Sequence, residues 1–104
     1  MKTIMLVCSA GMSTSLLVTK METAAKEENF EADIFAVSAT EANGILAEKD
    51  VDVLLLGPQV RFMLKQFEDK VADKGIPVSV IDMADYGMMN GQKVLQEAKK
   101  LMGL

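Results

Sequence analysis

The 104-residue sequence contains no histidine and only one cysteine, Cys8. A lone cysteine cannot form an internal disulfide, and without histidine the chain lacks the usual ligands of a structural zinc site. The scarcity of cysteine also fits a reducing, cytoplasmic setting. We therefore expect no disulfide framework, no bound metal and no cofactor.

Positive charge is scarce as well. Eleven lysines and arginines face fifteen aspartates and glutamates, which gives a formal net charge of -4, and no basic cluster stands out. Proteins that bind the phosphate backbone of nucleic acids need a clustered basic face. The composition therefore argues against nucleic acid as a partner.

Long apolar runs are also missing. The start of the chain, MKTIMLVC, superficially resembles a bacterial lipoprotein signal, but its apolar core is only IMLV. Such a core needs roughly 7 to 15 residues, and a membrane span needs about 18. We expect a soluble, unprocessed chain.

Half of the residues are hydrophobic, enough for one core, and the length favours a single domain over residues 1–104. Short apolar segments that predict buried strands alternate with amphipathic patterns that predict helices. The predicted strands are 3–8, 33–37, 52–57 and 78–82, and the predicted helices are about 14–29, a short one after the capping box of Ser38 and Glu41, 60–71 and 94–102. We predict an α/β fold: one four-stranded parallel sheet, order 2-1-3-4, with helices on both faces.

This strand order places Cys8 at the topological switch point, where ligands bind at the carboxyl ends of strands. Cys8 ends the first strand, just before a loop that leads into a helix. A helix N-terminus attracts anions and favours the nucleophilic thiolate form of a nearby cysteine. The loop adds a glycine that permits positive φ and four hydroxyl residues. These residues are Gly11, Ser9, Ser13, Thr14 and Ser15. The junction is suited to hold a tetrahedral oxyanion beside sulfur.

Other interpretations of this junction remain open. Free cysteines are often small buried hydrophobes, and hydroxyl residues are common in turns and caps. Cysteine phosphatases carry C-x5-R, but Thr14 stands in place of that arginine, and the only arginine is Arg61. Hydrolysis should therefore be poor, although Asp82 or Asp85 could act as the general acid. A phosphocarrier fits better than a low-molecular-weight phosphatase, an arsenate reductase or a noncovalent anion-binding module.

The stretches CSAGMSTSLLV, DVLLLGPQV and VIDMADYG resemble the IIB component of the sugar phosphotransferase system, lactose/cellobiose/chitobiose family. The resemblance covers essentially the whole chain and implies the fold of low-molecular-weight tyrosine phosphatases. It further implies that Cys8 takes a phosphoryl group from a phosphohistidine of the IIA protein. Cys8 would then pass that group to a disaccharide held by the membrane-embedded IIC component, as a phosphocysteine–sugar phosphotransferase.

The resemblance also implies where the site lies. The family's phosphate loop maps onto Ser9, Ala10, Gly11, Met12, Ser13, Thr14 and Ser15. The protein would be cytoplasmic and would meet the membrane only when docked on IIC. The identity of the disaccharide does not carry over.

Four more residues are candidates for the periphery of the site, namely Pro58, Gln59, Arg61 and Tyr86. Gln59 could donate to a phosphate oxygen, and Arg61 could approach the phosphate or an acidic partner, although plain turn and surface roles are open to both. Tyr86 is expected in a loop after the fourth strand, either lining the docking face or capping the core. Met88 and Met89 are expected in the same loop, in contact with partners.

Overall fold

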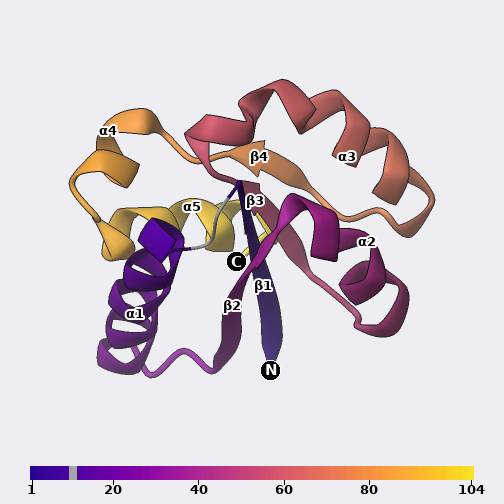
Figure 1. Ribbon diagram of the computed structural model, residues 1–104. Coiled ribbons are helices and arrows are strands. Elements are labelled where there is room, and N and C mark those ends of the chain that lie inside the picture. The colour runs from indigo at the N-terminus through magenta and orange to yellow at the C-terminus, as the bar shows by residue number, and fades with distance from the viewer. Residues whose placement is uncertain (10–11) are drawn as a thin grey trace.

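A computed structural model of the chain describes residues 1–9 and 12–104. Strands and helices alternate along it, as the sequence predicts (Figure 1). The elements are β1 (Lys2–Cys8), α1 (Met12–Glu27), β2 (Ala32–Ser38), α2 (Ala39–Glu48), β3 (Val53–Leu56), η1 (Pro58–Met63), α3 (Leu64–Val71), η2 (Ala72–Lys74), β4 (Val78–Val80), α4 (Met83–Gly87) and α5 (Gly91–Leu101). η1 and η2 are short 3-10 helices.

The four strands form one parallel sheet in the order β2-β1-β3-β4, which confirms the predicted order. Their carboxyl ends are in register: Cys8 pairs with Ser38, Val7 with Leu56 and Leu56 with Val80. The segments that follow the strands therefore leave the sheet from the same edge. This edge carries the candidate site.

The sheet separates two hydrophobic cores. Ile4 and Leu6 of β1 face the core under α1 and α5, whereas Met5 and Val7 face the core under α2 and α3. Figure 1 shows these two helix pairs on opposite sides of the sheet. Burial on both faces explains why the central strands are continuously apolar rather than alternating.

The structure corrects the prediction of a loop after the fourth strand. That segment forms α4, and the Asp82 carboxylate caps the helix by accepting hydrogen bonds from the backbone N–H groups of Ala84 and Asp85, at 3.1 and 3.2 Å. Tyr86 therefore lies in a helix and not in a loop. It is buried in the core beneath α1 and α5, which confirms the core alternative for this residue. The helix is too short to show a helical period in the sequence.

Several element boundaries also differ from the prediction, two of them near the site. α1 begins at Met12 rather than near residue 14, and the predicted helix over 60–71 divides into η1 and α3. The division falls at Met63, whose φ of -94° and ψ of 5° lie outside the helical region, and η1 is itself kinked at Val60. In the part of the chain that the structure describes, no helix is long and apolar enough to cross a membrane.

Candidate phosphate site

Cys8 is the last residue of β1, between β2 and β3, and only 3% of it is exposed. Its thiol donates to the backbone carbonyl oxygen of Val37 at 3.8 Å, a long and weak contact. Only residues 9–11 separate Cys8 from the start of α1. The sulfur and a helix N-terminus therefore occupy the same corner of the molecule.

The charge of this corner favours an anion. The first turn of α1 contains no acidic residue, so the positive end of the helix dipole is not offset there. Backbone N–H groups of a first helical turn lack intrahelical partners and are available to oxygen ligands. This arrangement suits a phosphoryl group on sulfur.

Parts of the predicted phosphate loop can be placed, and others cannot. Ser9 is an exposed bend residue, and Ser15 is exposed on α1. Ala10 and Gly11 lie outside the described residues, as do the side chains of Met12 and Ser13, so their phosphate contacts stay predictions.

Thr14 is fully buried, and its hydroxyl oxygen lies 3.4 Å from that of Tyr86. The structure thus turns a predicted loop hydroxyl toward the core. No local signal could have shown this contact, because the two residues are 72 positions apart.

The segment after β3 approaches Cys8 from the neighbouring strand. Gly57 donates its backbone N–H to the carbonyl oxygen of Val7 at 2.8 Å. A Cβ on Gly57 would lie 3.8 Å from Cys8 Cβ and 3.0 Å from Gln59 Oε1. The Gln59 side-chain oxygen therefore folds back over Gly57, whose Cβ position also lies near Cys8.

Pro58 and Arg61 lie on the same short helix, η1. Pro58 is buried, and the exposed Arg61 donates from Nη1 to the Pro58 carbonyl oxygen at 3.4 Å. Among the described residues Arg61 makes no ion pair. The position of the phosphatase arginine is occupied by the buried Thr14, so the site lacks that clamp.

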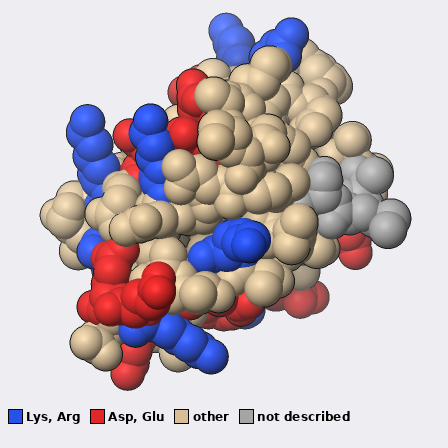
Figure 2. All heavy atoms as spheres, turned by 90° about the vertical axis from the view of Figure 1, so that its left-hand side faces the viewer, with Lys and Arg blue, Asp and Glu red and all other residues tan. Residues whose placement is uncertain are grey.

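Several large apolar side chains are exposed on the segments that follow the strands, and the sequence predicted a contact role for only one of them, Met88. Away from the chain ends, the large exposed hydrophobics of the described residues are Leu16 (51%), Phe62 (80%), Met83 (62%) and Met88 (80%). All four lie on segments that follow the carboxyl ends of strands. Figure 2 shows an extended tan surface on this side of the molecule, with acidic and basic side chains beside it. We call these four residues the apolar rim.

Met88 and Met89 differ in exposure although they are adjacent in the sequence. Met88 is exposed, as predicted, but Met89 is half-buried and packs against the core beneath α1 and α5. Met89 has a positive φ of 53° at the turn between α4 and α5, and its side chain packs inward. Within residues 1–9 and 12–104, no three Cys, Asp or Glu side chains are grouped to hold a metal ion.

Residues 3–97 match the model of a family described as the PTS system, Lactose/Cellobiose specific IIB subunit. The chain belongs to this family. PTS denotes the phosphotransferase system, so the protein is a IIB component of a sugar phosphotransferase system.

The chain is also similar in sequence to named EIIB components, which supports its membership in the IIB family. The chain is 51% identical to a galactose-specific EIIB component of Lactococcus lactis subsp. cremoris, over 97% of this chain and 96% of that protein. It is 50% identical to a cellobiose-specific EIIB component of Lactococcus lactis subsp. lactis, with the same coverage. An oligo-beta-mannoside-specific EIIB component of Bacillus subtilis is 43% identical over 98% of this chain and 97% of that protein.

Solved IIB structures share the architecture. A cellobiose-specific IIB component from Borrelia burgdorferi superposes with a TM-score of 0.78 at 45% identity, covering 98% of this chain and 92% of that chain. A lactose-specific IIB domain from Streptococcus pneumoniae has a TM-score of 0.84 at 16% identity and 95% coverage of both chains, which shows a shared fold. IIB domains have the fold of low-molecular-weight tyrosine phosphatases, so the predicted fold is confirmed.

Proposed function

We propose that the chain is a phosphocarrier in which residues 1–104 act as one IIB domain and Cys8 carries the phosphoryl group. The donor is a phosphohistidine of IIA, and the acceptor is a disaccharide of the lactose, cellobiose or chitobiose type held by IIC. The observation that carries the proposal is the position of the only thiol, which ends β1 just before the N-terminus of α1. Membership in the IIB family supports it.

The transfer step needs alignment and charge stabilisation. Phosphoryl transfer passes through a loose transition state with charge on three equatorial oxygens. The Cys8 thiolate attacks the phosphorus in line, the S–P bond forms, the P–N bond of phosphohistidine breaks, and the imidazole nitrogen leaves with the electron pair. Backbone N–H groups of residues 9–15 and the Ser13 hydroxyl hold the oxygens. Thr14 contributes its amide, since its hydroxyl faces Tyr86.

Two features favour carrying the group over hydrolysing it. The phosphatase arginine is replaced by Thr14, and Cys8 is shielded from water. Because Cys8 is buried, binding of the IIA donor must also expose the sulfur before it can attack in line. Gln59, whose side chain folds back over Gly57, supplies a further donor to the phosphoryl oxygens, and Arg61 at the same edge adds positive charge.

The apolar rim supplies a docking surface for both partners in turn. Its four exposed side chains lie on segments that leave the sheet from the edge that carries Cys8, where a protein that reaches the sulfur would contact them. The carrier works in the cytoplasm and meets the membrane only on IIC. The names of the relatives, which include galactose, cellobiose and oligo-beta-mannoside, support a small sugar as the final acceptor.

The test is the intact mass of the purified protein after incubation with phosphoenolpyruvate, the general phosphotransferase proteins and candidate IIA proteins. We expect the wild type to gain one phosphoryl group and Cys8→Ser to gain none while keeping its fold. Cys8→Ala serves as a second control that lacks any nucleophile. Uptake that persists in both variants would disprove the phosphocysteine.

Two further measurements separate the alternative functions. Turnover of an aryl phosphate that depends on Cys8 would favour a phosphatase. Binding of inorganic phosphate that is unchanged in Cys8→Ala, together with no uptake from any donor, would favour a noncovalent anion-binding module.

A further inference from the structure

Two hydroxyl groups from distant parts of the sequence meet inside the protein, behind the phosphate site. Thr14 belongs to the first turn of α1 and is fully buried, and Tyr86 belongs to α4 and is 7% exposed. Their hydroxyl oxygens are 3.4 Å apart, and either can donate. Buried hydroxyls are costly unless they are hydrogen-bonded, so this pair has a reason to stay together although the contact is long.

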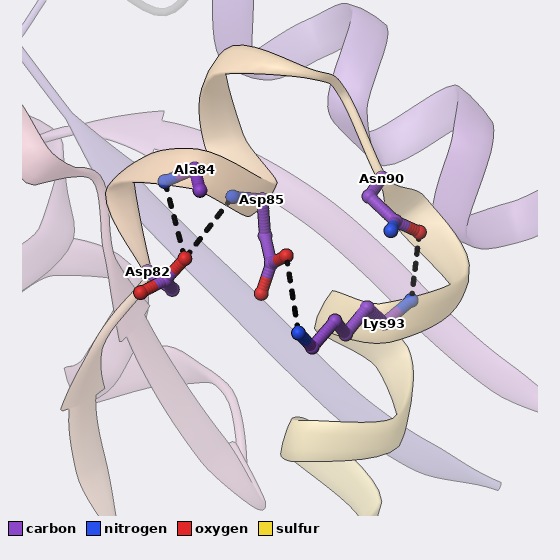
Figure 3. A network of polar contacts seen from close by, with 5 residues as sticks. All are labelled: Asp82, Ala84, Asp85, Asn90 and Lys93. Carbon is purple, nitrogen blue, oxygen red and sulfur yellow. Dashed lines mark hydrogen bonds and ion pairs between the residues drawn. The ribbon is translucent and has the colours of Figure 1, made fainter.

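Hydrogen bonds and an ion pair hold α4, the helix that carries Tyr86, in its position. Asp82 caps the start of α4, and Asn90 caps the start of α5 by accepting from the Lys93 N–H at 3.1 Å. The side chains of Asp85 and Lys93 point toward each other from the two helices (Figure 3), with 3.7 Å between Oδ1 and Nζ. These contacts tie α4 to the end of β4 and to α5.

α5 is in turn fixed against α1. A Cβ on Gly91 would lie 2.4 Å from the carbonyl carbon of Lys20 and 2.6 Å from the nitrogen of Met21, so the two backbones touch. The unit formed by α4 and α5 therefore contacts α1 at two levels: at Lys20 and Met21 within the helix, and at Thr14 in its first turn.

We propose that Tyr86 is a positioning residue for phosphoryl transfer. Its hydroxyl holds Thr14 and thereby fixes the first turn of α1, whose N–H groups must already point at the incoming phosphoryl oxygens. Donors that are oriented before the reaction need no reorganisation during it, which is how such sites stabilise a transition state. In this proposal Tyr86 acts on the reaction through Thr14. The inference rests on the proposed function for the identity of the anion, although the fixed first turn can be tested separately.

The variants that test it are Tyr86→Phe and Thr14→Val, each of which removes one hydroxyl. We expect the maximal rate of phosphoryl transfer from phosphorylated IIA to fall about threefold to fivefold in each, with little change in the KM for IIA. The combined loss in the double variant should be smaller than the product of the two single losses, since both changes remove the Thr14–Tyr86 interaction. Thr14→Ser, which keeps a hydroxyl, should recover most of the rate lost in Thr14→Val.

Thr23→Val is the matched control. Thr23 lies on the same helix and donates its hydroxyl to the carbonyl oxygen of Thr19 at 3.1 Å, but it is exposed and away from the site. We expect this variant to transfer phosphoryl groups at the wild-type rate. A Tyr86→Phe protein that transfers at the wild-type rate, or a loss of rate equalled by Thr23→Val, would overturn the proposal.

A second readout does not depend on transfer. The backbone amide resonances of residues 9 and 12–15 should shift in Tyr86→Phe, and the affinity for inorganic phosphate should fall by a similar threefold to fivefold. Unchanged amide resonances together with unchanged phosphate affinity would overturn the inference. If Cys8 takes no phosphoryl group from any donor, the proposed function fails, and this second readout still decides the role of Tyr86.

Discussion

Two neighbouring strands of the sheet end side by side, and each leads into a helix, but the two helix N-termini are used differently. Cys8 and Ser38 are register partners at the ends of β1 and β2. Ser38 leads directly into α2 and closes a capping box: its hydroxyl accepts from the Glu41 N–H at 3.3 Å, and the Glu41 carboxylate accepts from the Ser38 N–H at 3.1 Å. The N-terminus of α2 is satisfied by its own side chains.

The junction after Cys8 has the opposite character. Residues 9–11 intervene before α1, and the first turn of that helix contains no carboxylate. The same local topology therefore gives two different helix N-termini. The one at Ser38 is capped by side chains that include a carboxylate, and the one near Cys8 has a first turn without a carboxylate, which favours an anion. In the described residues the two junctions therefore differ in one feature, the capping box with a carboxylate that closes the start of α2.

Gly91→Ala should lower the stability of the protein more than any other variant considered, and the loss should concern the packing of α1 and not that of α2. The added methyl group meets the backbone of Lys20 and Met21, which cannot move as a flexible side chain can. We expect a loss of about 2 kcal/mol in the free energy of unfolding, measured by urea denaturation. Hydrogen exchange should speed up in α1 more than in α2.

Gly44→Ala is the control for that variant. Gly44 lies inside α2, where an added Cβ meets nothing within 4 Å, so alanine should stabilise the protein by about 0.5 to 1 kcal/mol. If both alanines have the same effect on stability, the close contact between α1 and α5 is not what makes Gly91 necessary.

Ser15→Glu gives α1 the carboxylate that α2 already has. The new charge lies near the N-terminus of α1 and competes with the phosphoryl group for the same end of the helix dipole. We expect phosphoryl uptake to slow about fivefold, the rate equivalent of roughly 1 kcal/mol. The measurement is the rate at which the intact mass increases, with Ser15→Gln as the uncharged control. Equal rates for Glu and Gln would show that charge at this helix end is unimportant.

Ser38→Ala removes the side-chain cap of α2 and should lower the stability of the protein less than Gly91→Ala does. Loss of the cap should cost about 1 kcal/mol of stability in urea denaturation, because α2 loses its N-terminal partner. Phosphoryl uptake by Cys8 should be unchanged when measured well below the unfolding transition. A marked slowing of uptake would mean that the two junctions are coupled and that the contrast between them is too simple.

The same variant should also change the pH dependence of stability, which is the smallest expected effect. Hydrogen bonds from the backbone N–H and the hydroxyl of Ser38 lower the pKa of Glu41 in the folded protein from 4.5. A lowered folded pKa stabilises the protein above the unfolded pKa, and that stability is lost as the pH falls through the folded pKa. Urea midpoints between neutral and acidic pH should therefore fall less steeply in Ser38→Ala than in the wild type. Parallel curves would contradict this role of Glu41.

The sequence by itself determined the features that depend on local pattern. Apolar segments alternating with amphipathic ones predicted a parallel sheet, because each strand and helix carries its own periodicity, and the simplest arrangement of four such strands is the observed order. The capping box of Ser38 and Glu41 was readable because its two partners are three residues apart. Cys8 was identified as the candidate nucleophile for the same reason, since a strand end, a loop and a helix start follow one another directly.

Only the tertiary structure decided how the site is supported and surrounded. It brought Thr14 against Tyr86 across 72 positions, seated Gly91 on the backbone of α1 and folded Gln59 over Gly57 beside Cys8. α4 escaped prediction because its five residues are too few to display a helical period. Contacts of this kind depend on where the packed layers place segments that are distant in sequence, and no local pattern encodes that placement.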